Sequence, residues 1–226
     1  MCKEQVMKYG LIILFALVSV TSIAQTDSSK WALSCHYNSG FAYRNLVIAN
    51  DNLSPLKESL DEIEKRKFAQ GVQFGLSRKI TEKLSWSTGL GYQQFGHQMD
   101  SLDGVTLIKQ TLGFIQIPLS IRYQFLGESK ISPYVSGGMQ YGFLISDRLQ
   151  YKLTSANRLF EERNTGQWNK NLLSAQAAVG IHFHVYPKNI LCVGLVGQYG
   201  INTVTKSELQ RHVYGWGIQM GWSMGL

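Results

Sequence analysis

The feature that most constrains this chain is a period of two in its hydrophobic residues. In the last segment apolar or aromatic residues occupy every second position: Tyr214, Trp216, Ile218, Met220, Trp222, Met224 and Leu226. Glycine, serine or glutamine stands at every position between them. Successive side chains of a strand point to opposite faces, so this segment predicts a strand with one apolar face and one small or polar face.

The same alternation recurs upstream, which brings the number of predicted strands to eight. The earlier segments lie at residues 31–43, 68–77, 84–93, 115–125, 135–143, 173–185 and 191–201. A soluble β-sandwich or a lipocalin-like barrel also alternates, but it turns charged side chains outward. Here the second face is Gly, Ser, Gln and Asn with very few Lys or Glu, which favours the polar lumen of a transmembrane barrel over a secreted sandwich.

The connections between these segments alternate in length. Short ones fall near residues 81–83, 127–130 and 187–189, and long ones span about 44–65, 97–108, 147–170 and 204–209. Tight periplasmic turns and longer outer loops are typical of outer-membrane barrels. We therefore predict an all-β fold, an eight-stranded antiparallel up-and-down transmembrane β-barrel with both termini periplasmic and four long extracellular loops.

The N-terminus indicates export. Lys3 and Lys8 precede an apolar run at residues 11–20, and Ser22-Ile23-Ala24 supplies the small residues of a cleavage site. The run is too short to cross a bilayer, which takes roughly 20 residues as a helix. We predict a cleaved signal peptide at residues 1–24 and a barrel domain at 25–226, located in the outer membrane of a bacterium. A retained N-terminal anchor, and a true start at Met7, remain alternatives.

Aromatic residues gather near both ends of the predicted strands. The set expected at the two membrane interfaces is Trp31, Trp86, Tyr92, Tyr123, Phe125, Tyr199, Trp216 and Trp222. Amphipathic rings at two interfaces would produce two outward-facing belts. Within the first long loop a short helix is expected, because Ser54 can cap it, Pro55 suits its first turn, and Leu56, Leu60 and Ile63 share one stripe.

The predicted lumen holds one polar cluster of interest, made of Arg122, Gln116, Gln140, Gln176, His182 and His184. An unpaired buried cation is expensive, so we expect lumen amides and water to solvate Arg122, with an anionic partner as the alternative. The two histidines share one face, but the sequence supplies no third metal ligand at the same depth. We expect no metal, no cofactor and no catalytic residues.

Charge and strand number limit the partners. The formal net charge is +7, but the basic residues are scattered and no aromatic-interleaved basic patch appears, which excludes nucleic acid. Eight strands leave an interior that side chains can fill. Inward glycines would loosen this lumen into water-filled cavities without implying a continuous channel. Outer-membrane lipid is the expected partner, other envelope or secretion proteins are a further class, and the chain is expected to be monomeric.

Three functions follow, in decreasing order of preference. The first is a non-enzymatic barrel that acts through its extracellular loops as a structural, adhesion or protein-export-associated component. The second is a small-solute pore. The third is a lipid-modifying enzyme, for which His212 has the right face and height, although Gln210 and Tyr214 beside it offer no nucleophile.

One stretch resembles a known family. The run Phe114-Ile115-Gln116-Ile117-Pro118-Leu119-Ser120-Ile121-Arg122-Tyr123-Gln124-Phe125 is similar to the fourth strand of the PorT-like outer-membrane β-barrel proteins of Bacteroidota. The resemblance implies the eight-strand layout over nearly all of the mature chain, and PorT itself is associated with secretion of surface proteins. Leu226 departs from the usual final Phe or Tyr. Pro118 cannot donate a ladder hydrogen bond, so a bulge or local break is expected there.

Overall fold

The computed structural model describes residues 30–48, 54–102, 105–126, 129–153, 159–163, 168–186, 188–205 and 209–226. The predicted signal peptide lies outside them. The elements are β1 (Trp31–Ile48), α2 (Ser54–Ile63), β2 (Glu64–Lys79), β3 (Leu84–Leu102), β4 (Val105–Gln124), β5 (Ile131–Leu153), β6 (Leu159–Glu162), β7 (Asn171–Tyr186), β8 (Asn189–Gly200) and β9 (Leu209–Gly225).

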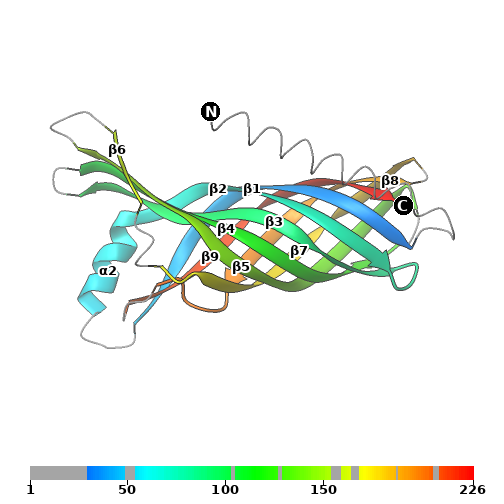
Figure 1. The fold of residues 1–226 in the computed structure, drawn as a ribbon, viewed down its shortest axis with the longest axis horizontal. Helices are drawn as coiled ribbons and strands as arrows, with labels where there is room; N and C mark the ends of the chain where they lie inside the picture. The colour runs from blue at the N-terminus through cyan, green and yellow to red at the C-terminus, as the bar shows by residue number, and fades with distance from the viewer. Residues whose placement is uncertain are drawn as a thin grey trace, which may run out of the picture.

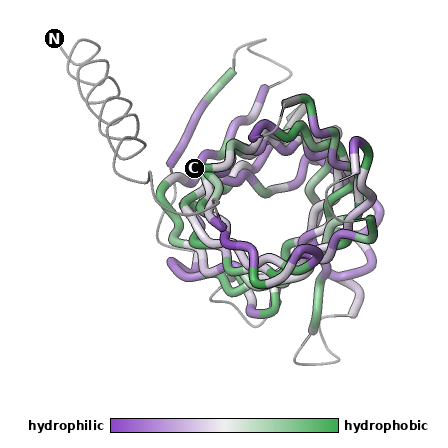
Figure 2. The backbone as a smooth tube through the Cα atoms, turned by 90° about the vertical axis from the view of Figure 1, so that its right-hand side faces the viewer, coloured by the Kyte–Doolittle hydropathy of each residue, from purple (hydrophilic) through white to green (hydrophobic). Residues whose placement is uncertain are grey.

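Eight of the strands form a closed antiparallel ring. Each of these strands pairs with the next one along the chain, β5 pairs with β7 because the short β6 pairs only with β5 among the described strands and lies outside the ring, and β1 pairs with β9 to close it. Figure 1 shows the strands tilted along the barrel, and Figure 2 looks along it. The predicted eight-stranded up-and-down barrel is confirmed.

At Pro118 the β3–β4 ladder passes from Thr88↔Leu119 to Gly91↔Gln116 without a register shift, so the predicted break is local and no bulge occurs there.

The ring has two different ends. At the short-turn end, β2–β3, β4–β5 and β7–β8 are joined by brief connections, and β1 begins and β9 ends there. The opposite end, here called the mouth, carries α2 and the β5–β6 hairpin (Figure 1). The helix expected from Ser54 is confirmed as α2.

Three predicted loops are wrong in extent. The first loses residues 44–48 to β1 and 64–65 to β2. Residues 97–102 and 105–108 belong to β3 and β4, and β5 runs to Leu153 and carries the additional strand β6. These parts of β3, β4, β5 and β6 project past the rest of the barrel at the mouth and are called the projecting sheet (Figure 1). Outward positions there include Gln98 and Lys109. Without lipid contact the alternating hydrophobicity disappears while the ladder hydrogen bonds continue, so the period-two signal could not reveal these strand ends.

The barrel has its apolar residues outside. Outward side chains such as Leu90, Leu119 and Leu195 are about three-fifths exposed, at 59%, 59% and 60%. Inward Gln116 and Ser174, by contrast, are buried. Soluble proteins rarely expose apolar surface on this scale, whereas lipid covers it in a membrane barrel. Among the described residues no helix is both long enough and apolar enough to cross a membrane.

The aromatic residues pack against one another around both ends of the apolar surface. At the short-turn end Trp31 meets Trp86 edge-on at 5.9 Å, and Tyr123 meets Phe125 at 5.3 Å. Towards the mouth, Phe41 packs between Phe68 and Trp216. Such pairs stabilise neighbouring strands beyond simple area burial.

Candidate functional site

The lumen is divided into layers, which the inward positions of β4 show in order. From the short-turn end these positions are Gln124, Arg122, Ser120, Pro118, Gln116, Phe114, Leu112 and Gln110. They pass from polar and cationic residues through an amide layer to an apolar layer and back to polar residues. Each layer receives side chains from several strands, because the inward residues of all strands point into the same narrow interior.

The short-turn end opens into a cavity of about 470 Å³, here called the vestibule. Lys30, Lys79 and Lys188 line its rim, and Arg122 and His184 lie deeper. Small inward residues such as Ser77 and Gly225 leave the space between them open. None of the described lining residues is acidic, so the vestibule is strongly cationic.

Arg122 lies at the inner end of the vestibule without a charged partner among the described residues. Its guanidinium carbon lies 5.0 Å from the ring centroid of Tyr134, a cation–π contact. Its Nε is buried and has no hydrogen-bond partner among the described residues. Tyr134 is fully buried and also packs against His182, with ring centroids 4.4 Å apart.

The predicted polar cluster is split into two groups. Gln140 donates a hydrogen bond to Gln176, and Gln116 is buried in the same middle layer. His182 lies nearer the short-turn end and bonds to Gln124, while the Nδ1 of His184 is buried without a partner among the described residues. Among the described residues no hydrogen bond joins Arg122 to Gln116, Gln140 or Gln176, and its solvation by lumen water stays a prediction.

An apolar layer lies in the lumen towards the mouth, beyond the polar positions that the sequence predicted. Its members are buried to within a few per cent and come from six strands and two mouth segments: Ala42, Ala69, Phe95, Leu112, Phe114, Trp168, Leu172, Val204 and Val213. The rings of Phe95 and Phe114 meet edge-on at 5.9 Å. This layer lies between the vestibule and the mouth.

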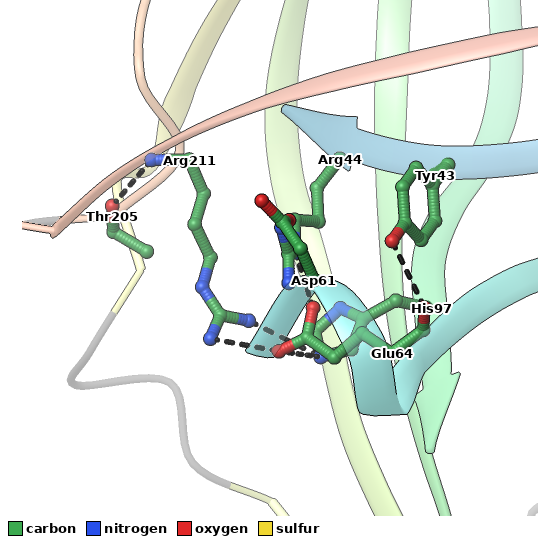
Figure 3. A network of polar contacts seen from close by, with 7 residues as sticks. All are labelled: Tyr43, Arg44, Asp61, Glu64, His97, Thr205 and Arg211. Atoms are coloured by element: carbon green, nitrogen blue, oxygen red, sulfur yellow. Dashed lines mark hydrogen bonds and ion pairs between the residues drawn. The ribbon is translucent and has the colours of Figure 1, made fainter. Parts of the chain in front are cut away.

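A buried charge network lies on the mouth side of the apolar layer (Figure 3). Glu64 directly follows α2, and its side chain is 0% exposed. Its carboxylate accepts hydrogen bonds from Arg44 Nε and, at 3.2 Å, from Arg211 Nη2. Arg44 also donates from Nη1 to Asp61 of α2 at 2.6 Å. These bonds fix the end of α2 inside the mouth.

His97 completes this network as a neutral group. It lies beyond the membrane-crossing part of β3, where outward positions are polar. Burial first, and then the nearby guanidinium groups of Arg211 and Arg44, lower the pKa of His97 to about 3. A neutral imidazole can accept the hydrogen bond that its Nε2 makes with Arg211 Nη1 at 3.1 Å.

Sequence reasoning missed both the apolar layer and the charge network. Arg44 and Glu64 were assigned to a loop, although Arg44 continues the inward alternation of β1 through Ala42. Extending the alternation past the aromatic belt would have placed Arg44 and Arg211 on the inward face. No local signal marks Glu64, whose position depends on the β2 register shift between Arg66 and Gly71.

Neither a metal site nor a catalytic group emerges in the described part of the chain. It holds no cluster of three or more His, Cys, Asp or Glu residues that could hold a metal ion. The imidazole of His212 stacks on Tyr199, and its Nδ1 lies 3.1 Å from the Gly200 carbonyl oxygen. Among the described residues it has no serine partner.

The sequence matches the family described as "Outer membrane protein beta-barrel domain" over residues 23–226. The chain belongs to this family. The barrel is therefore a bacterial outer-membrane protein, in agreement with its apolar exterior. Nothing among the curated proteins matches the sequence.

Several solved outer-membrane barrels are similar in structure. Neisserial surface protein A is 12% identical with a TM-score of 0.49, and the match covers 89% of this chain and 100% of that one. OprG from Pseudomonas aeruginosa is 12% identical with a TM-score of 0.42, covering 85% and 96%. The outer membrane protease OmpT from Escherichia coli is 9% identical with a TM-score of 0.40, covering 89% and 99%. Likenesses this distant do not indicate function.

Proposed function

We propose that this outer-membrane barrel is a non-enzymatic interaction protein that acts through its projecting sheet, as an adhesion or protein-export-associated component. The apolar layer carries the proposal, because a lumen filled by packed Phe95, Phe114 and Leu172 does not suit solute passage. The orientation that fits has the short-turn end and both termini in the periplasm and the mouth outside. The likeness of residues 114–125 to PorT-like proteins supports the export-associated role.

The projecting sheet offers a surface for contacts outside the membrane. It has an edge at β6, which pairs with β5 alone among the described strands. A free edge can pair with an extended segment of another protein. The buried Glu64 network holds α2 at the mouth beside this sheet, so the outer end is built as an ordered platform.

Conductance separates this function from that of a pore. Purified barrel reconstituted into planar bilayers is expected to remain electrically silent, because the apolar layer blocks ion flow. The double variant Phe95→Ala/Phe114→Ala removes two rings of that layer and serves as the positive control, which should conduct. Steady unitary conductance of the unaltered protein would contradict the proposal and favour the pore.

Shortening the projecting sheet tests the interaction role. Met99 and Ile108 are paired, so residues 100–107 can be replaced by Asn-Gly, a two-residue hairpin turn. The barrel should still fold, while adhesion of the producing bacteria to surfaces or their export of surface proteins should fall. A folded short variant with both properties unchanged would contradict the proposal.

A further inference from the structure

The vestibule combines a cavity with a concentration of positive charge that the proposed function does not use. Its volume of about 470 Å³ lies within the range of roughly 300–1,000 Å³ typical of small-molecule sites. The three lysines Lys30, Lys79 and Lys188 come from three different parts of the ring and line the same opening. The apolar layer lies farther into the lumen than the vestibule.

Arg122 is the deepest charge of this pocket. A guanidinium carries five N–H donors arranged in a planar fork, which suits carboxylate and phosphate oxygens. Among the described residues no acidic side chain and no amide meets this fork, and its buried Nε lacks a partner. The ring of Tyr134 covers one side of the guanidinium, so an anion would be bound through the N–H groups in the guanidinium plane.

A second group with a buried, unpartnered polar atom lines the same pocket. Nδ1 of His184 is buried without a partner, although the residue lines the vestibule. Gln124 also lines the pocket, with its amide bonded to His182. The polar groups of the pocket are therefore held in place by their own contacts while some of their bonding capacity remains unfilled, at a cost that a ligand would offset.

We propose that the vestibule is a binding site for a small anionic solute that enters from the short-turn side. A carboxylate or phosphate group of the solute forms charge-assisted hydrogen bonds with Arg122, and the lysine rim draws it in. The rim attracts anions over a distance of about 10 Å at moderate salt, whereas the buried guanidinium supplies the specific contact. Nothing in this site requires the projecting sheet, so it can be tested separately from the proposed function.

The test is calorimetric titration of the barrel in a zwitterionic detergent with pyrophosphate and with citrate. Saturable binding of at least one of them at low salt is expected, and it should weaken as salt rises. Pyrophosphate binding alone would assign the site to phosphate groups, and citrate binding alone would assign it to carboxylates. No binding of either probe would overturn the proposal.

Arg122→Gln removes the charge and keeps an amide of similar reach, and it should weaken binding about tenfold or more. Arg78→Gln is the matched control, because Arg78 lies at the same end but is exposed and stacks on Trp31 at 5.2 Å. Equal loss in the two variants, or no loss in Arg122→Gln, would overturn the site. If Arg122→Gln does not fold, Lys30→Gln/Lys188→Gln should weaken binding severalfold, and unchanged binding there would overturn it.

Discussion

At the scale of single residues, Glu64 joins three parts of the mouth. It is the first residue after α2, and its carboxylate bonds to Arg44 of β1 and Arg211 of β9. A buried charge is tolerated when it is paired and hydrogen-bonded, and it becomes costly when one partner is removed. The position of α2 therefore depends on one carboxylate rather than on apolar packing alone.

Replacing this carboxylate should release α2. In Glu64→Gln the guanidinium groups of Arg44 and Arg211 lose their shared anion, which costs about 3–5 kcal/mol for a buried pair. Hydrogen exchange measured on the folded barrel should then show faster exchange across α2 and the start of β2. Protection of α2 equal to that of the unaltered protein would contradict this role.

An exposed ion pair in the same region serves as the control. Arg148 and Glu161 are 3.3 Å apart, with side chains 48% and 40% exposed. Solvent screens such pairs, so Glu161→Gln should change stability by about 0–1 kcal/mol and leave the exchange of α2 unchanged.

A second residue-scale prediction concerns Gly96, whose φ of +147° is unfavourable for other residues. A Cβ there would lie 2.0 Å from the carbonyl oxygen of Gln110. Gly96→Ala should lower the free energy of unfolding by about 1–3 kcal/mol, measured by urea unfolding in vesicles. At Gly197 a Cβ would meet nothing within 4 Å, so Gly197→Ala should be neutral or slightly stabilising. Equal stability of the two variants would contradict the strain at Gly96.

At the scale of elements, β3, β4 and β5 each have a membrane-crossing part and a projecting part. Leu119 is outward in the crossing part and 59% exposed, whereas Gln98 is outward in the projecting part. A lysine facing lipid near the midplane costs about 2–4 kcal/mol, and near the interface or beyond it about 0–1 kcal/mol. Leu119→Lys should therefore destabilise the refolded barrel strongly, and Gln98→Lys should not. Similar urea midpoints for the two variants would mean that the membrane boundary assigned here is wrong.

The crossing parts of the strands could be predicted from the sequence because lipid and lumen impose opposite polarity on alternate residues. Beyond the aromatic belt only one of these two environments remains, so residues 97–102 carry no such signal even though their ladder continues. The short strand β6 is four residues long and has no alternation of its own that identifies it. Its pairing depends on where β5 ends, and tertiary contacts decide that position.

The polar cluster could be predicted only as a set of inward residues. Alternation placed Arg122, Gln140 and Gln176 on the lumen face, which the structure agrees with. It did not give their depth relative to residues of other strands, because depth depends on the registers between strands. Tyr134 was missed for this reason: its inward position contacts Arg122 only through the β4–β5 register.

At the scale of the whole molecule, the closed ring combines an apolar exterior with an apolar layer of buried side chains in its lumen. Ring closure leaves no free edge within the membrane, as a lipid environment requires. The ends differ in character, because one holds a cationic vestibule and the other an ordered platform of α2 and the projecting sheet. This division fits the proposed role, in which the barrel presents a surface on each side instead of conducting between them.

The most direct test is heat modifiability of the protein taken from separated inner and outer membranes. A closed barrel resists denaturation by detergent at room temperature, so the unboiled protein from the outer-membrane fraction should migrate faster on a denaturing gel and shift to its full apparent mass on boiling. A protein that is soluble in the periplasm and shows no shift would contradict the membrane barrel, and its alternating strands would then belong to a secreted β-sandwich.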